Sequence, residues 1–551
     1  MTPMQRFRNL LRIDKKDIYQ IILYSILAGI ISLSLPLGIQ SIVNFLQAGK
    51  VSTSWVVLVI IVVAGVAMVG IFRIMQYRIT ENLQQKIFVR SSFEFAYRFP
   101  KIRFSNLYPY SPPELANRFF DTLTVQKGFS KLLLDISGAA LQILFGIVLL
   151  SLYHTFFIFF GIFLVVLLYL IFRINFYPGL STSLEESNYK YKVAHWLQEI
   201  ARNHLSFKNN KLFDFALHKN DRLVNSYLDQ RENHFGILRR QFIQLTGFKV
   251  IITAGLLIIG GMLVLNQQMN IGQFVAAEII ILTIITAVEK LFSGIELFYD
   301  VLTSLEKIGK VVDMDLESNP GAEHNNYMLD PDAMCIETEK LSYKFPNAEN
   351  FTLKEVTLKI NQGDRILIDG ANGAGKTTLI RLLSRVIEPT SGTIFINNTN
   401  YSKYAIDDYR SNIGTITIND NVFEGTIMEN ITCKNPGISL QEVQQVIANL
   451  QLTDYIRSLP DGLDTVLHSE GKQLSSSIIQ KILLARCIIS DPKILFLEEP
   501  LEKVDDSSAR EIIDYLTAGD KTWTLVIISK NEYWKEKCNK KFFLSEGKLK
   551  G

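Results

Sequence analysis

The amino-acid sequence predicts two domains of different fold class: a six-helix transmembrane domain over residues 1–314 and an α/β domain of the P-loop NTPase type over residues 332–551, with a linker at 315–331. Three observations predict this division. Residues 1–310 hold 31 Lys and Arg against 19 Asp and Glu, whereas residues 311–551 hold 26 against 35. The first part contains four long stretches with at most one charged side chain. The second part contains a phosphate-binding motif placed between a strand and a helix.

Composition excludes several classes of protein. A chain of 551 residues that is 48% hydrophobic can bury ample apolar surface, which excludes disorder. Its net charge of +3 is too small to hold a nucleic acid, so we expect no nucleic-acid partner. The four cysteines all lie after residue 334 and form no CxxC pair, which argues against a zinc site or a disulfide framework and suits a reducing compartment.

Uncharged stretches predict the membrane spans, because about 20 apolar residues cross the hydrocarbon core. The stretch at 18–49 predicts one long helix kinked at Pro36, and residues 51–72 predict a second helix. The stretch 136–172 is long enough for two spans with a turn near Tyr153 and His154. The stretch 250–288 holds only Glu278, and with the polar turn at 266–270 it supplies the last two of six spans.

Lysine and arginine placement predicts the orientation of these spans. Arg6, Arg8, Arg12, Lys15 and Lys16 precede the first span, and the segments between spans two and three and between spans four and five are rich in Lys and Arg. The loops on the opposite side carry only Lys50. By the positive-inside rule the N-terminus, both long segments and the second domain face the cytoplasm.

The two long basic segments keep helical apolar spacing, so we expect the membrane helices to continue into water. Short turns are then expected at the tips, around Ser111-Pro112-Pro113-Glu114 and Arg202-Asn203-His204-Leu205, where they could touch the second domain.

Three glutamates share one face of the sixth span. Glu278, Glu289 and Glu296 are spaced 11 and 7 residues apart, which places them within roughly 20° of each other around a helix. Charge inside a membrane usually faces a cavity or a partner, so the three residues could form an acidic wall on a translocation path. Alternatively, Glu289 and Glu296 are already near the cytoplasmic end and are solvated or paired, for example with Lys290.

A P-loop motif lies between a predicted buried strand at 364–370 and a predicted helix from residue 379 onward. The glycines let backbone N–H groups approach phosphates, and the helix N-terminus favours negative charge. Lys376 is expected to reach the β- and γ-phosphates of ATP, and the Thr377 hydroxyl to bind Mg²⁺. The predicted nucleotide-binding residues of the motif are Gly370, Asn372, Gly373, Ala374, Gly375, Lys376, Thr377 and Thr378.

Two carboxylates follow a second predicted buried strand at 493–497. The carboxyl end of a parallel strand is where a doubly wound sheet holds its ligand. Glu498 is therefore expected to hold Mg²⁺, and Glu499 to orient or deprotonate an attacking water.

With these motifs, nearly the whole chain resembles an ABC exporter half-transporter, which fuses six spans to one ATP-binding domain. The segment LPDGLDTVLHSEGKQLSSSIIQKILLARCIISDPKILFLEEPLEKVD follows that family without a gap. Span six, from IGQF to SLEKIGKVVD, resembles the toxin and bacteriocin exporters of type 1 secretion, although their usual N-terminal peptidase domain is not expected in this chain. The resemblance implies that Tyr343 stacks on adenine, that Ser475 contacts a γ-phosphate, and that Asp505 belongs to the nucleotide site.

The chain departs from the family at several positions that act in hydrolysis. The signature LSGGQ is replaced by residues 474–478, LSSSI, so the glycines gain side chains and the final Gln becomes Ile. The Q-loop Gln aligns with Ile418, whose side chain cannot bind a hard cation. The switch His aligns with Lys530, which could contact a γ-phosphate only as a point charge. The Walker B Asp is Glu498, and Glu499 is intact.

These matches and departures predict a subunit of an ATP-driven exporter of the bacterial inner membrane that binds Mg-ATP and hydrolyses it slowly. The resemblance implies a dimer with two composite nucleotide sites, and a second half-transporter in a heterodimer is favoured over a homodimer. It also suggests a peptide or protein cargo, with a periplasmic adaptor and an outer-membrane channel as further partners. The alternative is a membrane-embedded regulatory or structural subunit that binds ATP without turnover.

Overall fold

The computed structural model describes residues 1–47, 53–317, 329–330 and 334–550. The chain divides into two compact units. The first unit consists of Met1–Ile102 and Tyr110–Asp315, and the second of Arg103–Pro109 and Leu316–Gly551. Most of the predicted linker lies outside the described residues.

The regular secondary structure of the first unit is helical in its described residues, apart from a single bridge residue at Ile102. Six of its segments are long and apolar enough to cross a membrane, as predicted. Its elements are α1 (Pro3–Ile13), α2 (Lys15–Ser32), α3 (Ser34–Gln47), α4 (Thr53–Arg98), α6 (Pro112–Asn117), α7 (Asp121–Tyr153), α8 (Phe156–Arg202), α9 (Asn210–Gly255), a π-helical turn (Leu256–Gly260), α10 (Gly261–Leu265) and α11 (Ile271–Val312), with short 3-10 turns at Phe99–Lys101, Arg118–Phe120 and Ser206–Lys208.

The first span is broken at Leu33, between α2 and α3. Pro36 explains the position of the break. Proline has no N–H to donate to the carbonyl four residues earlier, which is that of Ser32, and its ring crowds the same carbonyl. The kink predicted at Pro36 is therefore confirmed, with the interruption one helical turn ahead of the proline.

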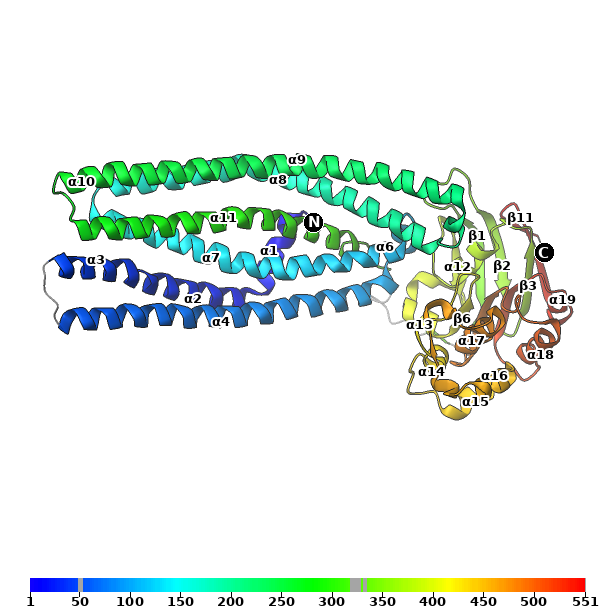
Figure 1. The fold of residues 1–551 in the computed structure, drawn as a ribbon. Helices are drawn as coiled ribbons and strands as arrows, with labels where there is room; N and C mark the ends of the chain where they lie inside the picture. Colours follow the sequence, from blue (N-terminus) through cyan, green and yellow to red (C-terminus); the bar gives the residue numbers. More distant parts are fainter. Residues whose placement is uncertain (48–52, 318–328, 331–333, 551) are drawn as a thin grey trace. The chain divides into compact units, whose positions relative to one another are not determined.

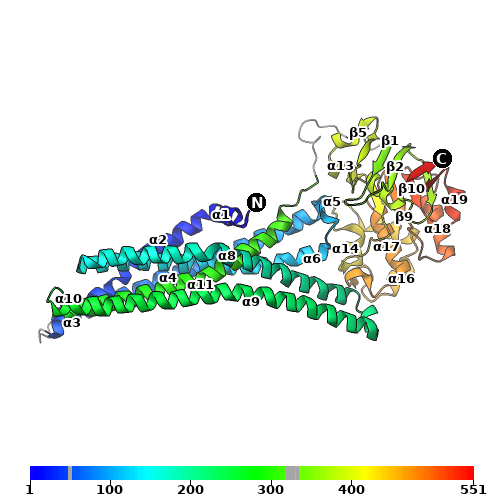
Figure 2. The same cartoon turned by 90° about the horizontal axis from the view of Figure 1, so that it is seen from above.

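The other turns also lie where the sequence predicts them. His154 and Thr155 separate α7 from α8, and residues 266–270 separate α10 from α11. The helices α4, α8 and α9 continue well beyond the uncharged stretches, as their apolar spacing indicates. Figures 1 and 2 both show α8 and α9 side by side over most of their length.

Burial differs strongly among the spans. In the most apolar window of α11, 44% of the residues are buried inside the unit, against 6% in α4. Large apolar side chains such as Val57, Ile60 and Val63 of α4 are at least half exposed. An apolar surface of this extent suits a hydrocarbon surrounding rather than water.

The second unit contains two principal sheets. A six-stranded sheet has the order β12-β11-β3-β10-β9-β6, and an antiparallel sheet has the order β2-β1-β4-β5. The strands are β1 (Ile336–Tyr343), β2 (Leu353–Ile360), β3 (Arg365–Gly370), β4 (Ser391–Ile396), β5 (Thr399–Asn400), β6 (Ile413–Ile416), β7 (Gly425–Thr426), β8 (Val466–Leu467), β9 (Ile494–Glu498), β10 (Thr524–Ile528), β11 (Lys540–Ser545) and β12 (Lys548–Lys550).

The central strands β3, β9 and β10 are parallel and buried on both faces. Alternate residues enter different cores: Leu495 and Leu497 belong to one cluster, and Ile494 and Phe496 to the other. The helices around them are α12 (Lys376–Leu383), α13 (Ile406–Ser411), α14 (Ile427–Thr432), α15 (Leu440–Asn449), α16 (Thr453–Ser458), α17 (Ser476–Ile488), α18 (Asp506–Leu516) and α19 (Tyr533–Lys537). This arrangement confirms the predicted α/β class. Because β10 pairs in parallel with both β3 and β9, the carboxyl ends of the three strands meet at one edge of the sheet.

The short segment Arg103–Pro109, which includes α5 (Phe104–Leu107), belongs to the second unit although it follows α4 in sequence. Tyr108 stacks on Phe345 with ring centroids 5.3 Å apart. The Arg381 guanidinium lies 5.6 Å from the centre of the Phe104 ring. The second expected tip, after Arg202, is formed by residues 203–209 within the first unit.

Candidate nucleotide site

The P-loop connects β3 to α12 through three glycines in left-handed backbone geometry. Gly370, Gly373 and Gly375 have φ angles of +151°, +80° and +104°, which side-chain-bearing residues rarely adopt. A Cβ at Gly375 would also meet the Leu353 side chain at 2.8 Å and the Thr352 carbonyl oxygen at 3.0 Å. The glycines of the motif are therefore required by the loop conformation, and not only by access for a phosphate.

Lys376 opens α12 and folds its side chain back over the loop. Its ammonium donates to the carbonyl oxygens of Gly370 at 2.5 Å and of Ala371 at 3.0 Å. Asn372 and Gly373 are exposed at the loop surface, whereas Ala374 and Thr378 are buried against the core. The loop thus presents backbone N–H groups, a lysine and a helix N-terminus on one side, which is an anion-binding arrangement.

Thr377, in the first turn of α12, contacts Glu498, the last residue of β9. The Thr377 hydroxyl donates a short hydrogen bond to the Glu498 carboxylate. Glu498 ends β9 and is only 6% exposed, so its carboxylate is held in one place. Two hard oxygen donors side by side next to a phosphate-binding loop are the ligands that Mg²⁺ prefers. The structure therefore brings together the two residues predicted to bind the metal.

Glu499 follows with a left-handed backbone, at φ +45°, a strained conformation for a residue with a side chain. Its N–H donates to the Ile528 carbonyl at 2.7 Å, which ties it to β10. Its carboxylate accepts from the Ser529 hydroxyl at 3.2 Å and from the Lys530 N–H at 3.3 Å. Burial raises the pKa of Glu499, although these two hydrogen bonds partly offset the effect. A fixed carboxylate with a raised pKa is suited to the role of a general base.

Ile418 and Lys530, where the sequence predicts departures from the family, lie next to these carboxylates. The Ile418 N–H donates to Glu498 at 3.4 Å, while the Ile418 side chain is 62% exposed. Lys530 provides its backbone N–H to Glu499, and its side chain is exposed. Both residues therefore contact a carboxylate through a backbone N–H. The exposed side chain is aliphatic at Ile418 and positively charged at Lys530.

Ser475 and Asp505 are the N-cap residues of α17 and α18. The Ser475 hydroxyl accepts from the Ile478 N–H at 3.4 Å and is the N-cap of α17. Asp505 caps α18, and the Ser508 N–H lowers the pKa of its carboxyl to about 2. Both side chains have a structural explanation as caps, and their contacts with a nucleotide remain predictions.

Gln480, in the helix α17 that contains most of the signature segment 474–478, forms hydrogen bonds to the loop that follows β9. Its amide nitrogen donates to the Glu499 carbonyl at 3.1 Å, and its amide oxygen accepts from the Lys503 N–H at 2.7 Å. Sequence reasoning missed this role, because the only signal for it is the spacing in α17, two residues after Ile478. The sequence does not reveal the contact of Ser529 either, because only the fold brings that residue to Glu499.

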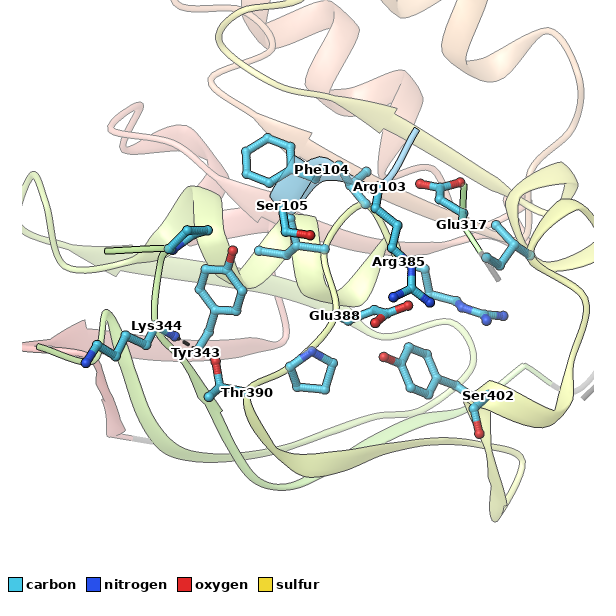
Figure 3. A pocket seen from close by; sticks show the side chains of 16 residues that line it. Arg103, Phe104, Ser105, Glu317, Tyr343, Lys344, Arg385, Glu388, Thr390 and Ser402 are labelled. Carbon is cyan, nitrogen blue, oxygen red and sulfur yellow. Dashed lines mark hydrogen bonds between the residues drawn. The ribbon is translucent and has the colours of Figure 1, made fainter. Parts of the chain in front are cut away.

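Tyr343, which the resemblance implies for adenine stacking, is largely buried. It is 6% exposed, belongs to the core of the antiparallel sheet and packs edge-to-face on Phe345. Tyr343 lines a cavity of about 560 Å³ within the second unit, together with Phe104, Arg385 and Glu388 (Figure 3). Phe345, two residues later, is only partly buried, so its ring is more accessible than that of Tyr343.

The three glutamates of α11 do not behave as one group. Glu278 and Glu296 are exposed, whereas Glu289 forms a close ion pair with Lys249 of α9. The alternative in which Glu289 is paired is therefore confirmed, but with Lys249 rather than Lys290. In the described residues, no cluster of His, Cys, Asp and Glu side chains is able to hold a metal ion by itself.

The sequence profile of the ABC transporter family matches residues 353–502. The chain is 28% identical over 299 residues, 54% of its length, to the alpha-hemolysin translocation ATP-binding protein HlyB of Escherichia coli O157:H7, covering 42% of that protein. It is 29% identical over 285 residues, 52% of its length, to an ATP-dependent lipid A-core flippase of Burkholderia orbicola (strain AU 1054), covering 47% of that protein. The chain thus spans about half the length of these curated relatives.

The fold also matches a solved structure, that of a bacterial Atm1-family ABC exporter with ATP bound. The TM-score is 0.83 at 18% sequence identity, over 98% of this chain and 94% of the other. At this identity the likeness concerns the fold alone.

Proposed function

Because the chain joins an ABC transporter domain to six membrane-length helices in the fold of an ABC exporter, we propose that it is one half of an ATP-driven exporter that binds Mg-ATP and hydrolyses it slowly. The observation that carries the proposal is the site at the ends of β3 and β9. There Lys376 lies over the P-loop and Thr377 is bonded to Glu498. These groups supply a phosphate cradle and two Mg²⁺ ligands.

Slow hydrolysis follows from the side chains around the intact base. Glu499 is held by β10 and the Ser529 hydroxyl, so a base for water activation is present. Ile418 has no oxygen to orient water or complete a magnesium shell. Lys530 attracts a γ-phosphate but cannot donate and accept at once as a neutral imidazole does. We therefore expect binding close to that of a standard domain and turnover well below it.

The adenine base is assigned to Phe345 rather than Tyr343. Its ring is partly buried, whereas the Tyr343 ring is enclosed in the core. Because Phe345 stacks on Tyr108, an adenine at Phe345 requires Tyr108 to share or leave that ring face. The phosphate contacts do not depend on this assignment.

A second half-transporter completes the two nucleotide sites in this proposal, since each site pairs one chain's P-loop with the other chain's signature segment. In a homodimer both sites would contain LSSSI and Ile418. In a heterodimer a partner with LSGGQ would give this chain's Lys376 and Glu499 a standard signature segment, so we favour the heterodimer.

Export of a peptide or protein across a bacterial inner membrane is the transport function we propose. It is supported by the similarity to the alpha-hemolysin translocation protein of Escherichia coli. In this proposal the N-terminus and the nucleotide-binding domain face the cytoplasm, which the distribution of Lys and Arg supports. A periplasmic adaptor and an outer-membrane channel are further proposed partners.

The second candidate is a membrane-embedded subunit that binds ATP and regulates a partner without turnover. The exposed apolar side chain of Ile418 beside the Mg²⁺ position favours it. The retained geometry of Glu499 favours the exporter.

Equilibrium binding of Mg-ATP to the purified full chain tests the shared part of both proposals. We expect saturable binding that is lost in Lys376→Ala, because the ammonium over the P-loop is removed. Lys548→Ala, which changes an exposed lysine on an edge strand, is the matched control and should bind normally. If the wild-type chain does not bind at millimolar ATP, both candidates are wrong.

A further inference from the structure

A cavity in the first unit has a lining that the nucleotide chemistry does not use. It lies among α2, α4 and α7, which contact one another (Figure 1), and has a volume of about 400 Å³. Lys290 of α11 completes its rim. Small side chains at Ala28, Gly29, Gly138 and Ala139 leave the space open. The volume is within the range of small-ligand sites.

The floor of this cavity is a hydrogen-bonded polar network. Gln76 is 7% exposed and donates to the Ser25 hydroxyl at 2.7 Å and to the Ile21 carbonyl at 3.1 Å. Ser25 is within 3.0 Å of the Ser137 hydroxyl, and Ser130 donates to the Thr80 carbonyl at 3.4 Å. Buried hydroxyl and amide groups fix the shape of the cavity and can bind a polar ligand.

The rim is strongly cationic. Arg73, Lys127, Lys131 and Lys290 line it, and Asp135 is the one carboxylate among the lining residues. Four positive charges against one negative charge leave a balance of +3. In the described part of the chain, none of these four cations has a salt bridge, although Lys249, Arg231 and Lys86 of the same unit are paired. Like charges gathered without counter-ions favour an anion between them.

The position of these four cations relative to the membrane surface indicates the source of that anion. Arg73 directly follows the uncharged stretch 51–72, Asp135 directly precedes 136–172, and Lys290 is two residues beyond 250–288. The cations therefore lie where three helices leave the hydrocarbon, at the level of lipid headgroups. Ser25, Gly29 and Ser32 lie inside the uncharged stretch 18–49, so the cavity extends from the headgroup level toward the acyl chains.

From these observations we infer that the cavity binds a phosphate-bearing anion, supplied by the headgroup of an anionic phospholipid in the surrounding leaflet. Basic pockets between transmembrane helices recognise such headgroups through their charge and hydrogen-bond donors. Arg73 and the three lysines bind the phosphate, while Gln76 and the serines accept or donate to the glycerol hydroxyls. The source in the leaflet rests on the proposed membrane placement, whereas the anion chemistry rests on the cavity alone.

Native mass spectrometry of the full chain tests the inference, with phosphatidylglycerol and phosphatidylcholine of identical acyl chains added in turn. The wild-type chain should retain phosphatidylglycerol in preference. In the double variant Lys127→Gln/Lys131→Gln, the ratio of retained phosphatidylglycerol to retained phosphatidylcholine should fall by roughly thirtyfold, the effect expected when two cations at the membrane surface are removed. Lys208→Gln/Lys211→Gln removes the same charge from exposed positions near the tip of α9 and should leave the preference intact.

A second arm distinguishes the source of the anion. Soluble sn-glycerol 3-phosphate is added to the chain in phosphatidylcholine nanodiscs, and thermal stability is measured. Stabilisation of the wild type, lost in Lys127→Gln/Lys131→Gln, supports the site with a soluble anion as its ligand. Equal retention of both lipids together with no effect of glycerol phosphate overturns the inference, as does a double variant that behaves like the wild type in both arms. ATP binding should be unchanged in this variant, so a failure here is separable from a failure of the nucleotide site.

Discussion

Glu499 has surroundings that suit the general base proposed for it. Its backbone is held by Ile528 and its carboxylate by Ser529 and Lys530. Glu499→Gln preserves the shape and the hydrogen-bond acceptor but cannot take a proton. We expect it to abolish whatever turnover the chain has while Mg-ATP binding stays within about twofold. Phosphate release and equilibrium binding, measured on the same preparation, check this, and unchanged turnover would remove Glu499 from the mechanism.

Ile418 is expected to limit hydrolysis because its backbone N–H contacts the Glu498 carboxylate while its side chain offers no oxygen to a metal or a water. Ile418→Gln introduces an amide oxygen at that position, and we predict turnover raised by roughly tenfold, less than the roughly hundredfold that one well-placed polar group contributes. Ile418→Leu is the control, since it changes the shape without adding an oxygen, and it should not raise turnover. The 62% exposure of Ile418 means that neither change disturbs the core.

The burial of Glu499 predicts the acid limb of the pH profile. Because burial raises its pKa above the ordinary value of 4.5, the carboxylate takes up a proton at a higher pH than an exposed glutamate does. A protonated base cannot activate water, so turnover should fall as the pH is lowered through this raised pKa and be restored above it. Binding of Mg-ATP measured over the same range is the control. A turnover limb at or below pH 4.5 contradicts the assignment.

At the scale of elements, the P-loop is set by backbone geometry that only glycine adopts easily. Gly375 has φ +104° and lies against Leu353 and the Thr352 carbonyl. Gly375→Ala should cost about 1–2 kcal/mol for the left-handed conformation alone and distort the start of α12, with loss of ATP binding. Gly519→Ala, where a Cβ meets nothing within 4 Å, is the matched control. Chemical denaturation and ATP binding together test the pair, and normal binding by Gly375→Ala would contradict the loop assignment.

Elements with strong local signals could be predicted from the sequence. Uncharged stretches indicated the spans, and the polar turn at 266–270 separated the last two spans. Pro36 indicated a kink, which the structure shows as the break at Leu33. The motif between β3 and α12 placed Lys376 and Thr377. These predictions succeeded because each depends on neighbours in sequence.

Contacts between distant segments could not be predicted in the same way. Lys249 meets Glu289 across two helices, although Lys290 is adjacent in sequence. Gln480 and Ser529 reach Glu499 only because α17 and β10 converge on β9. The resemblance implies stacking at Tyr343, but the pairing of β1 with β2 leaves Tyr343 in the core, whereas Phe345 is only partly buried. Side-chain direction there depends on strand register, which local pattern does not determine.

At the scale of the whole molecule, the small net charge of +3 conceals a basic membrane domain and an acidic nucleotide-binding domain. The excess of positive charge supports the proposed orientation and includes the four rim cations of the cavity among α2, α4 and α7. The acidic domain carries the proposed nucleotide site, with the P-loop, Glu498 and Glu499.

Assembly gives a further prediction at this scale. If the partner is a different half-transporter, affinity purification from the native membrane should recover a second six-span chain with an LSGGQ signature. Co-purified pairs should hydrolyse ATP faster than this chain alone, because a standard signature segment then faces Lys376 and Glu499. Recovery of this chain only, with unchanged turnover, would contradict the heterodimer and favour the homodimer.

The most direct test of the central claim is the fate of bound nucleotide. The purified full chain is mixed with stoichiometric radiolabelled Mg-ATP, and samples are quenched over time to count bound ATP and ADP. We predict that ATP binds, remains largely intact over many minutes, and is converted faster in Ile418→Gln. Rapid conversion to ADP in the wild type, or no retained nucleotide, would contradict an ATP-binding domain that holds its nucleotide and hydrolyses it slowly.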